Sequence, residues 1–488
     1  MSTARHPQAH TTVGTAVIGA GFSGIAVALK LQAAGEGDFV VYDKADAVGG
    51  TWQANTYPGA ACDAPSHVYS FSFAQQVDWS RRFAPGPEIR DYLQRCVDEA
   101  GITERFRLGV GVTSATWRDD RWELELTDGS RVDARVVVCA TGQLDIPAVP
   151  DIDGLETFSG PAFHTARWRH DVDLAGKRVA VIGTGASAVQ VIPAIAEEVE
   201  HLTVFQRSAP FVFPKPDGSY GPGISAVYRR YPLLRSAARQ LMWLYLEFFG
   251  MFFWRWPRML TSLALIHRIM LRHTVRDPDL RTALTPDHRI GCKRILIADG
   301  YHESLQRPNV TVSTDTIVGV RPGRVETDAG PCPIDVLVFA TGFATSGFAG
   351  SVSITGRDGM TLHDKWAGAP EAYLGLSVPD FPNLFFMYGP NTNLGSGSVI
   401  YLMEAQADHV VAAVKRLRRG AVGVLEVRRK VFADYMTALR SRQPGTVWAS
   451  GCDSWYKQAD GLDTHNWPWS MSRYRRMTRR VGPDVYGV

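Results

Sequence analysis

Two glycine-rich segments of this chain could bind phosphate groups. The first is Gly19-Ala-Gly21-Phe-Ser-Gly24, and the second runs from Gly183 to Ala188 as Gly-Thr-Gly-Ala-Ser-Ala. Glycines at this spacing let the backbone turn tightly and approach a pyrophosphate at the N-terminus of the following helix. Alanine is tolerated at the third position of that pattern. One such segment is a weak signal, but two in one chain predict two dinucleotide-binding sites.

The residue 24 positions after the first glycine differs between the two segments. It is Asp43 in the first and Arg207 in the second. A carboxylate there accepts hydrogen bonds from ribose hydroxyls, whereas a guanidinium attracts a ribose 2′-phosphate. The first site is therefore predicted to bind FAD, and the second to bind NADPH rather than NADH.

Both segments lie where a strand passes into a helix. Apolar runs at 15–18 and 179–182 precede the glycines, helical stretches follow, and further strands are predicted at 39–43 and 202–207. Each unit has the β-α-β order, whose right-handed crossover produces a parallel sheet.

Two later apolar runs, at 135–142 and 335–343, contain Ala-Thr-Gly at or near their ends, and the second glycine unit lies between them. We therefore predict an α/β fold with two Rossmann-like domains, the NADPH domain being inserted in the FAD domain. The expected boundaries are a tail at 1–12, the FAD domain at 13–150 and 335–488, the NADPH domain at 151–216 and 288–334, and a helical insertion at 217–287.

The expected insertion is rich in aromatic residues, with eight between Trp243 and Trp256. Three explanations stay open: packing between helices, lining of a substrate pocket, and contact with a membrane surface.

The bulk composition narrows the class of protein. The 488 residues carry a net charge of only +3 and no long basic run, so nucleic acid is not expected as a partner. No apolar run reaches the ~18 residues of a spanning helix, and the N-terminus lacks a secretion signal, so a cytoplasmic location is expected. The six cysteines form no metal-binding spacing, and we expect small buried thiols and no metal. The oligomeric state is not indicated.

Two further segments carry a family resemblance. Gly50-Thr51-Trp52 leads through Tyr-Pro-Gly to Asp63, and a linker has the pattern Phe-x-Gly-x-x-x-His164-x-x-x-Trp168. Together with the paired nucleotide units, they resemble the Baeyer–Villiger monooxygenases, which convert ketones to esters or lactones. The resemblance covers about residues 13–468. The linker departs from the family pattern at its last position, where Arg169 replaces proline or aspartate.

The same resemblance extends to Gly291-Cys-Lys293-Arg294. It implies that Arg294 is the active-site arginine and that Lys293 reaches the NADPH 2′-phosphate. Ile295 departs from the family, which usually has proline there. The stretches 451–456 and 467–468 resemble a family tail near the nicotinamide.

The cofactors imply a particular chemistry. NADPH would reduce the flavin, which would capture O2 as a peroxide; the deprotonated peroxide attacks ketones and the protonated form oxidises sulfur or nitrogen. Arg294 would stabilise the negative charge that develops, and Asp63 would pair with Arg294 and hold its orientation.

The predicted site residues form three groups. For FAD they are Gly19, Gly21, Gly24, Asp43, Lys44, Gly50, Thr51, Trp52, Asp63, Tyr69, Thr141 and Gly142. For NADPH they are Gly183, Thr184, Gly185, Ala186, Ser187, Ala188, Arg207, Ser208, Lys293 and Arg294. His164 and Trp168, in the linker, are expected to act in domain motion.

Three alternative functions stay open. Oxygenation of a heteroatom substrate uses the same cofactors; Trp168 and the complete segment from Gly50 to Asp63 favour a ketone instead, and Arg169 weakens that preference. A reductase that binds two dinucleotides usually needs a Cys-x-x-Cys pair to accept the electrons, and the sequence lacks one. A redox sensor without turnover is disfavoured by the complete NADPH pattern and by the expected Asp63–Arg294 pair.

Overall fold

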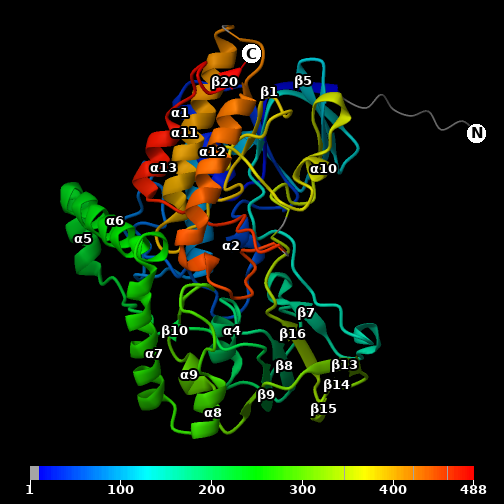
Figure 1. The fold of residues 1–488 in the computed structure, drawn as a ribbon, viewed down its shortest axis with the longest axis vertical. Coiled ribbons are helices and arrows are strands. Elements are labelled where there is room, and N and C mark those ends of the chain that lie inside the picture. The colour runs from blue at the N-terminus through cyan, green and yellow to red at the C-terminus, as the bar shows by residue number, and fades with distance from the viewer. Residues whose placement is uncertain (1–9, 346, 421, 459, 488) are drawn as a thin grey trace, which may run out of the picture.

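The computed structural model describes residues 10–345, 347–420, 422–458 and 460–487. Figure 1 shows two α/β parts along the long axis. The upper part, which we call the first layer, contains the N-terminal strands and the C-terminal helices. The lower part, the second layer, contains the strands of residues 160–340. The predicted α/β fold with Rossmann-like sheets is confirmed. Of the predicted tail at 1–12, residues 1–9 lie outside the described residues and residues 10–12 belong to the first strand.

The first sheet draws its strands from distant parts of the chain. Its order is β17-β4-β5-β6-β1-β2-β3, and β18 also pairs with β6. The strands are β1 (His10–Ile18), β2 (Phe39–Asp43), β3 (Phe106–Leu108), β4 (Val112–Arg118), β5 (Arg121–Leu126), β6 (Arg131–Cys139), β17 (Ser353–Thr355) and β18 (Leu384–Phe386). The parallel pairing of β1 with β2 and β6 is the one expected for a β-α-β unit.

The second sheet has the order β12-β9-β8-β16-β7 and is parallel throughout. Its strands are β7 (Ala162–His164), β8 (Arg178–Ile182), β9 (His201–Phe205), β12 (Val310–Ser313) and β16 (Val336–Phe339). Strand β9 ends two residues earlier than the sequence suggested, so Arg207 follows the sheet edge. The inner strands β8, β9 and β16 are almost completely buried, as parallel strands covered on both faces must be, whereas the edge strand β12 is partly exposed.

Helices cover both sheets. On the first, α1 (Phe22–Ala33) packs against α11 (Val399–Arg418) and α3 (Gly86–Glu99). On the second, α4 (Ala188–Ile195) lies against α9 (Tyr301–Ser304). A core of apolar residues from both ends of the chain joins α1, α3 and α11. Segments that are about 370 residues apart therefore fold as one layer.

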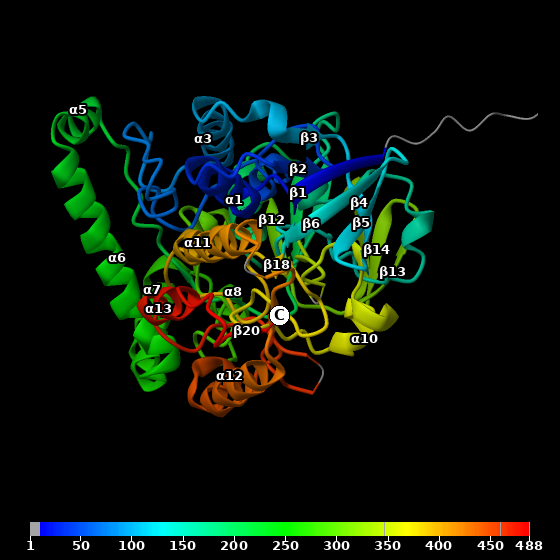
Figure 2. The ribbon, with the colours of Figure 1, turned by 90° about the horizontal axis from the view of Figure 1, so that it is seen from above.

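Residues 222–283 form four helices, of which the first two project from the layers and the last two pack on the apolar core of the second layer. They are α5 (Pro222–Arg230), α6 (Pro232–Trp254), α7 (Leu260–Thr274) and α8 (Pro278–Ala283). Figures 1 and 2 show α5 and α6 at the outer edge of the molecule. No helix in the described part of the chain is long and apolar enough to cross a membrane.

Short elements complete the fold. They are α2 (Thr51–Ala54), α10 (Leu362–Trp366), α12 (Arg429–Arg442), α13 (Met471–Thr478), the pair β10 (Val212–Phe213) and β11 (Leu296–Ile297), the three-stranded sheet β13 (Ile317–Arg321), β14 (Arg324–Thr327) and β15 (Gly330–Pro333), and the pair β19 (Glu426–Val427) and β20 (Tyr486–Gly487). Helices α12 and α13 bring the C-terminal part of the chain back to the first layer.

Candidate active site and nucleotide sites

The glycines of the first nucleotide segment are fixed by close backbone contacts. Gly19 has φ +113°, and a Cβ there would lie 2.5 Å from the Ala140 carbonyl oxygen. A Cβ on Gly24 would lie 1.8 Å from the Gly19 carbonyl oxygen. Helix α1 begins directly after Gly21, with no acidic residue in its first turn. The turn and the amides at this helix end fit the pyrophosphate of a bound FAD.

Asp43 closes this segment at the end of β2. Its carboxylate accepts hydrogen bonds from the backbone N–H groups of Ala20 (2.6 Å) and Ala45 (2.8 Å). Burial raises the Asp43 pKa, and the two hydrogen bonds oppose that shift. Lys44, which the sequence also assigned to FAD, places its Nζ 2.7 Å from Asp145.

The second segment repeats the first in geometry. Gly183 again has φ +113°, and a Cβ there would lie 2.5 Å from the Ala340 carbonyl oxygen. Around Gly185 a Cβ would meet no described atom within 4 Å, so the backbone is open to a ligand. Helix α4 follows from Ala188, and its first turn contains no acidic residue. Ala186 and Ser187 complete the turn, which fits the pyrophosphate of a bound NADPH.

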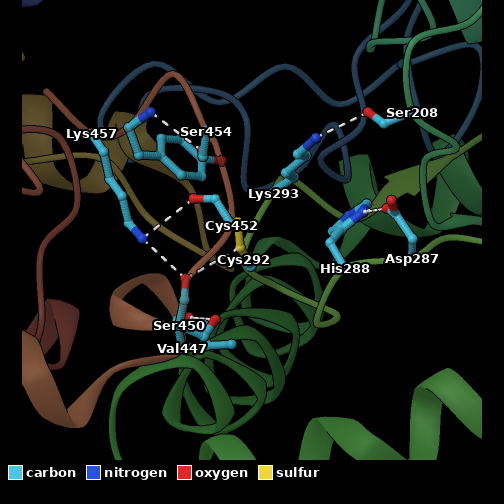
Figure 3. Close-up of a disulfide and its surroundings, with 11 residues drawn as sticks. Ser208, Asp287, His288, Cys292, Lys293, Val447, Ser450, Cys452, Ser454 and Lys457 are labelled. Carbon is cyan, nitrogen blue, oxygen red and sulfur yellow. Dashed lines mark hydrogen bonds and ion pairs between the residues drawn. A yellow bond between two sulfur atoms is a disulfide. The ribbon is translucent and has the colours of Figure 1, made fainter. Parts of the chain in front are cut away.

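Positive charge gathers beside this second turn. The Lys293 Nζ donates to the Ser208 hydroxyl (3.0 Å), as Figure 3 shows, and the Thr184 hydroxyl donates to the Ser208 carbonyl (3.0 Å). Arg207 is 88% exposed and lies 3.7 Å from the Asp453 carboxylate. Lys293 and Arg207 therefore reach the same edge of the turn, where a 2′-phosphate is expected.

The cysteine prediction is partly wrong. Cys292 and Cys452, which are 160 residues apart in sequence, form a disulfide with a Cα–Cα separation of 6.4 Å (Figure 3). The cysteine spacing does not indicate this bond, because only folding brings these two loops together. The bond ties the 451–456 segment to the loop of Lys293 and Arg294. Four cysteines are free as expected: Cys62, Cys96, Cys139 and Cys332.

The catalytic candidates Arg294 and Asp63 lie in contact. The Arg294 Nε and Nη2 donate to one Asp63 carboxylate oxygen at 2.9 and 2.6 Å. The Asp63 charge raises the Arg294 pKa further above its ordinary value. Arg294 therefore keeps its proton at every working pH, and its orientation is fixed by two hydrogen bonds. The Arg294 side chain still has 42% of its surface exposed.

Two tyrosines share the electrostatic environment of Arg294. Burial raises the pKa of Tyr388 and Tyr456, the latter to about 12, and the Arg294 charge opposes both shifts. The Tyr388 hydroxyl donates to the Asn393 carboxamide oxygen at 2.8 Å. The sequence did not assign a role to either tyrosine, since each is about a hundred residues or more from Arg294. Both remain neutral hydrogen-bonding groups beside the arginine.

Gln190 holds the Asp63 loop against the second layer. Its side-chain oxygen accepts from the Tyr57 hydroxyl (2.9 Å), and its amide nitrogen donates to the Ala61 carbonyl (2.9 Å). Gly59 packs so closely on α4 that a Cβ there would lie 2.6 Å from the Gln190 carbonyl oxygen. Gln190, a residue of the second layer, thus positions the loop that ends at Asp63. The sequence analysis did not predict this role of Gln190.

We expect Gln190→Ala to destabilise the protein by about 1–3 kcal/mol, since the buried Tyr57 hydroxyl loses its acceptor. Oxygenation should fall because the Asp63 loop loosens. Thermal unfolding and product yield measure the two effects. Gln94→Ala is the control, since Gln94 bonds only the exposed Asp98 within α3. Equal unfolding temperatures for the two variants would contradict the positioning role.

The remaining predicted residues surround these sites. The Trp52 indole nitrogen donates to the Tyr69 hydroxyl (3.3 Å), and Tyr69 packs edge-to-face on Phe22 of α1. Thr51 begins α2 directly after Gly50. After β6, the Thr141 hydroxyl donates to the Phe348 carbonyl, and Gly142 has φ +74°.

The linker residues His164 and Trp168 are held locally. The His164 Nδ1 accepts from the Ala166 N–H at 3.0 Å, and burial lowers the His164 pKa. Trp168 packs edge-to-face on Phe163, at the end of β7. Both lie where the chain passes from the first layer to the second.

Two dinucleotide turns beside an arginine–carboxylate pair define the class: a flavoprotein that uses NADPH. Residues 16–229 match the family model described as pyridine nucleotide-disulphide oxidoreductase. That model covers the two nucleotide segments.

Full-length relatives define the family. A Baeyer–Villiger monooxygenase of Streptomyces coelicolor is 41% identical over 99% of this chain and 94% of its own length. One from Pseudomonas aeruginosa is 40% identical over 100% of this chain and 93% of its own length. The chain belongs to the Baeyer–Villiger monooxygenases, and it is an FAD- and NADPH-dependent monooxygenase.

Solved structures of the same kind share the fold. The closed crystal structure of cyclohexanone monooxygenase is 31% identical, with a TM-score of 0.88 over 98% of both chains. The oxidised steroid monooxygenase bound to NADP is 31% identical, with a TM-score of 0.86 over 96% of this chain and 97% of that one.

Proposed function

We propose that the substrate is a small apolar ketone, and that Arg294 supplies the charge that makes oxygen insertion next to its carbonyl possible. Bound FAD, reduced by NADPH, supplies the activated oxygen. The observation that carries the proposal is the two-point hydrogen bond between Arg294 and Asp63, because it fixes a permanent cation in one orientation.

Arg294 acts in this proposal by favouring negative charge near its guanidinium. Attack on a ketone requires a deprotonated oxidant and creates an oxyanion, and a fixed cation stabilises both. Asp63 balances the charge of Arg294 and keeps the guanidinium from turning away. Tyr388 and Tyr456 stay neutral at working pH, and the Tyr388 hydroxyl is held by its hydrogen bond to Asn393.

The ligand assignments follow from the same geometry. Gly19, Gly21, Gly24 and Asp43 would hold the adenosine diphosphate part of FAD, and Thr51, Trp52 and Tyr69 would line the flavin. Gly183, Gly185, Arg207 and Lys293 would hold NADPH. The domain boundaries predicted from the sequence and a cytoplasmic location are also parts of the proposal.

A panel of cyclic ketones, aryl ketones and sulfides under oxygen-18 gas tests the substrate class. We expect labelled lactones or esters, with an optimum on the alkaline side, because ketone attack needs the deprotonated oxidant. Sulfoxides should form as a side activity that persists at lower pH. Mass spectrometry of the products, at a series of pH values around neutrality, measures the label in the lactones or esters and in the sulfoxides. Label found only in sulfoxides or N-oxides, with every ketone intact, would assign the chain to heteroatom oxygenation.

A further inference from the structure

The projecting helices expose an unusual amount of apolar surface. We define the helical arm as residues 222–274, from the start of α5 to the end of α7. Of the 21 large hydrophobic side chains that are exposed in the described part of the chain, 14 lie in this arm. They are Ile224, Val227, Tyr231, Leu233, Leu234, Leu241, Leu244, Tyr245, Phe248, Trp256, Met259, Leu265, Ile266 and Ile269. So high a share of the exposed apolar side chains in one segment indicates an interaction site.

Helix α6 shows that this face is distinct from its packing face. Leu241, Leu244, Tyr245 and Phe248 follow helical spacing and are 49–67% exposed. On the other side, Trp243 packs on Tyr401 with ring centroids 5.4 Å apart. The arm is thus held to the body by one face of α6 and leaves the other uncovered, at the outer edge that Figure 2 shows from above.

The charge of the arm indicates what covers this face. It contains eight arginines, no lysine, no aspartate and one glutamate, a net charge of +7. The whole chain carries +3, so the remainder is net −4. The single carboxylate, Glu247, turns inward and accepts hydrogen bonds from the N–H groups of Met471 (2.9 Å) and Ser472 (3.1 Å). Arg239 also turns inward and donates to the His67 and Ser70 carbonyls, so the charges left for the outer surface come from the other arginines.

A cationic cavity adjoins the arm where α6 ends. It has a volume of about 750 Å³ and is lined by Trp254 and by five arginines, Arg255, Arg442, Arg473, Arg476 and Arg480. Arg442 donates to the Trp254 carbonyl at 2.8 Å, which fixes one wall. Guanidinium groups of this density attract phosphate, so the cavity suits the headgroup of an anionic lipid.

We propose that the helical arm docks on the surface of an anionic phospholipid bilayer, with its apolar side chains in the interface and its arginines at the phosphates. Aromatic and leucine side chains beside arginines are the composition that binds this boundary. A second copy of the chain fits less well. A symmetric contact through this face would place arginines against arginines in an apolar setting.

Sedimentation with vesicles tests the proposal on the full-length holoenzyme. We expect binding to phosphatidylcholine vesicles that contain phosphatidylglycerol, weaker binding at high salt, and little binding to phosphatidylcholine alone. Leu233→Ser with Leu241→Ser and Phe248→Ser should weaken binding about tenfold or more. The control is Val149→Ser with Val318→Ser and Met360→Ser, which removes three exposed apolar groups outside the arm.

The arginines are tested separately. Arg229→Gln, Arg230→Gln, Arg268→Gln and Arg272→Gln together should abolish the preference for phosphatidylglycerol, whereas Arg118→Gln with Arg121→Gln on β4 and β5 should not. NADPH oxidation by every variant in solution should match the wild type, which shows that each is folded. The proposal would be overturned if the triple variant at Leu233, Leu241 and Phe248 (the leucine variant) bound vesicles as well as its control does. It would also be overturned if the wild type did not bind anionic vesicles. Self-association in the ultracentrifuge that the leucine variant loses, without vesicle binding, would overturn it too.

Discussion

Arg294→Ala is expected to abolish oxygenated product, with a loss of about 10²–10³-fold in product formation. The substitution removes the only charge that the Asp63 carboxylate fixes in place, and a preorganised charge at a reaction centre is typically worth that much. FAD should remain bound, because Gly19, Gly21, Gly24 and Asp43 are untouched. Remaining NADPH oxidation should then yield hydrogen peroxide. Gas chromatography of product and a peroxidase assay measure the two outcomes.

Arg294→Lys separates charge from geometry. Lysine keeps the positive charge, but it lacks the planar pair of N–H donors with which the Arg294 guanidinium holds one Asp63 oxygen. We expect partial recovery of product relative to alanine, with more hydrogen peroxide than the wild type forms. A wild-type product yield in Arg294→Ala would remove this residue from the mechanism.

Arg207→Ala is expected to raise the Michaelis constant for NADPH by about tenfold or more and to leave that for NADH nearly unchanged. A charge-assisted hydrogen bond to phosphate contributes about 1.5–3 kcal/mol. The exposure of Arg207 places the effect at the lower end of that range, since solvent screens the charge. Adding Lys293→Ala should increase the loss. Steady-state kinetics with both cofactors measures the preference.

The control for this experiment is Arg307→Ala. Arg307 is another surface arginine near the second sheet, and it pairs with Glu197 at 2.8 Å. It should leave both Michaelis constants unchanged. Equal losses with NADPH and NADH in Arg207→Ala would show that Arg207 does not read the 2′-phosphate.

The sequence by itself determined the parts of this protein that are local in the chain. Each nucleotide turn is encoded within about 25 residues, since glycine spacing and strand periodicity act over short distances. The parallel pairing of β1 with β2 and of β8 with β9 follows from that order. The pairing of Asp63 with Arg294 is not local, and it was predicted only because the surrounding segments resemble a known family.

Only the tertiary structure decided contacts between distant segments. Gln190 meets the Asp63 loop, Tyr388 and Tyr456 approach Arg294, and Cys292 meets Cys452 because separate layers pack together. No spacing rule predicts such meetings, since side chains that fill a common space leave no periodic signal. The arm illustrates the same limit: its aromatic residues were equally consistent with a core, and only the packing of α6 on one face shows which side chains remain exposed.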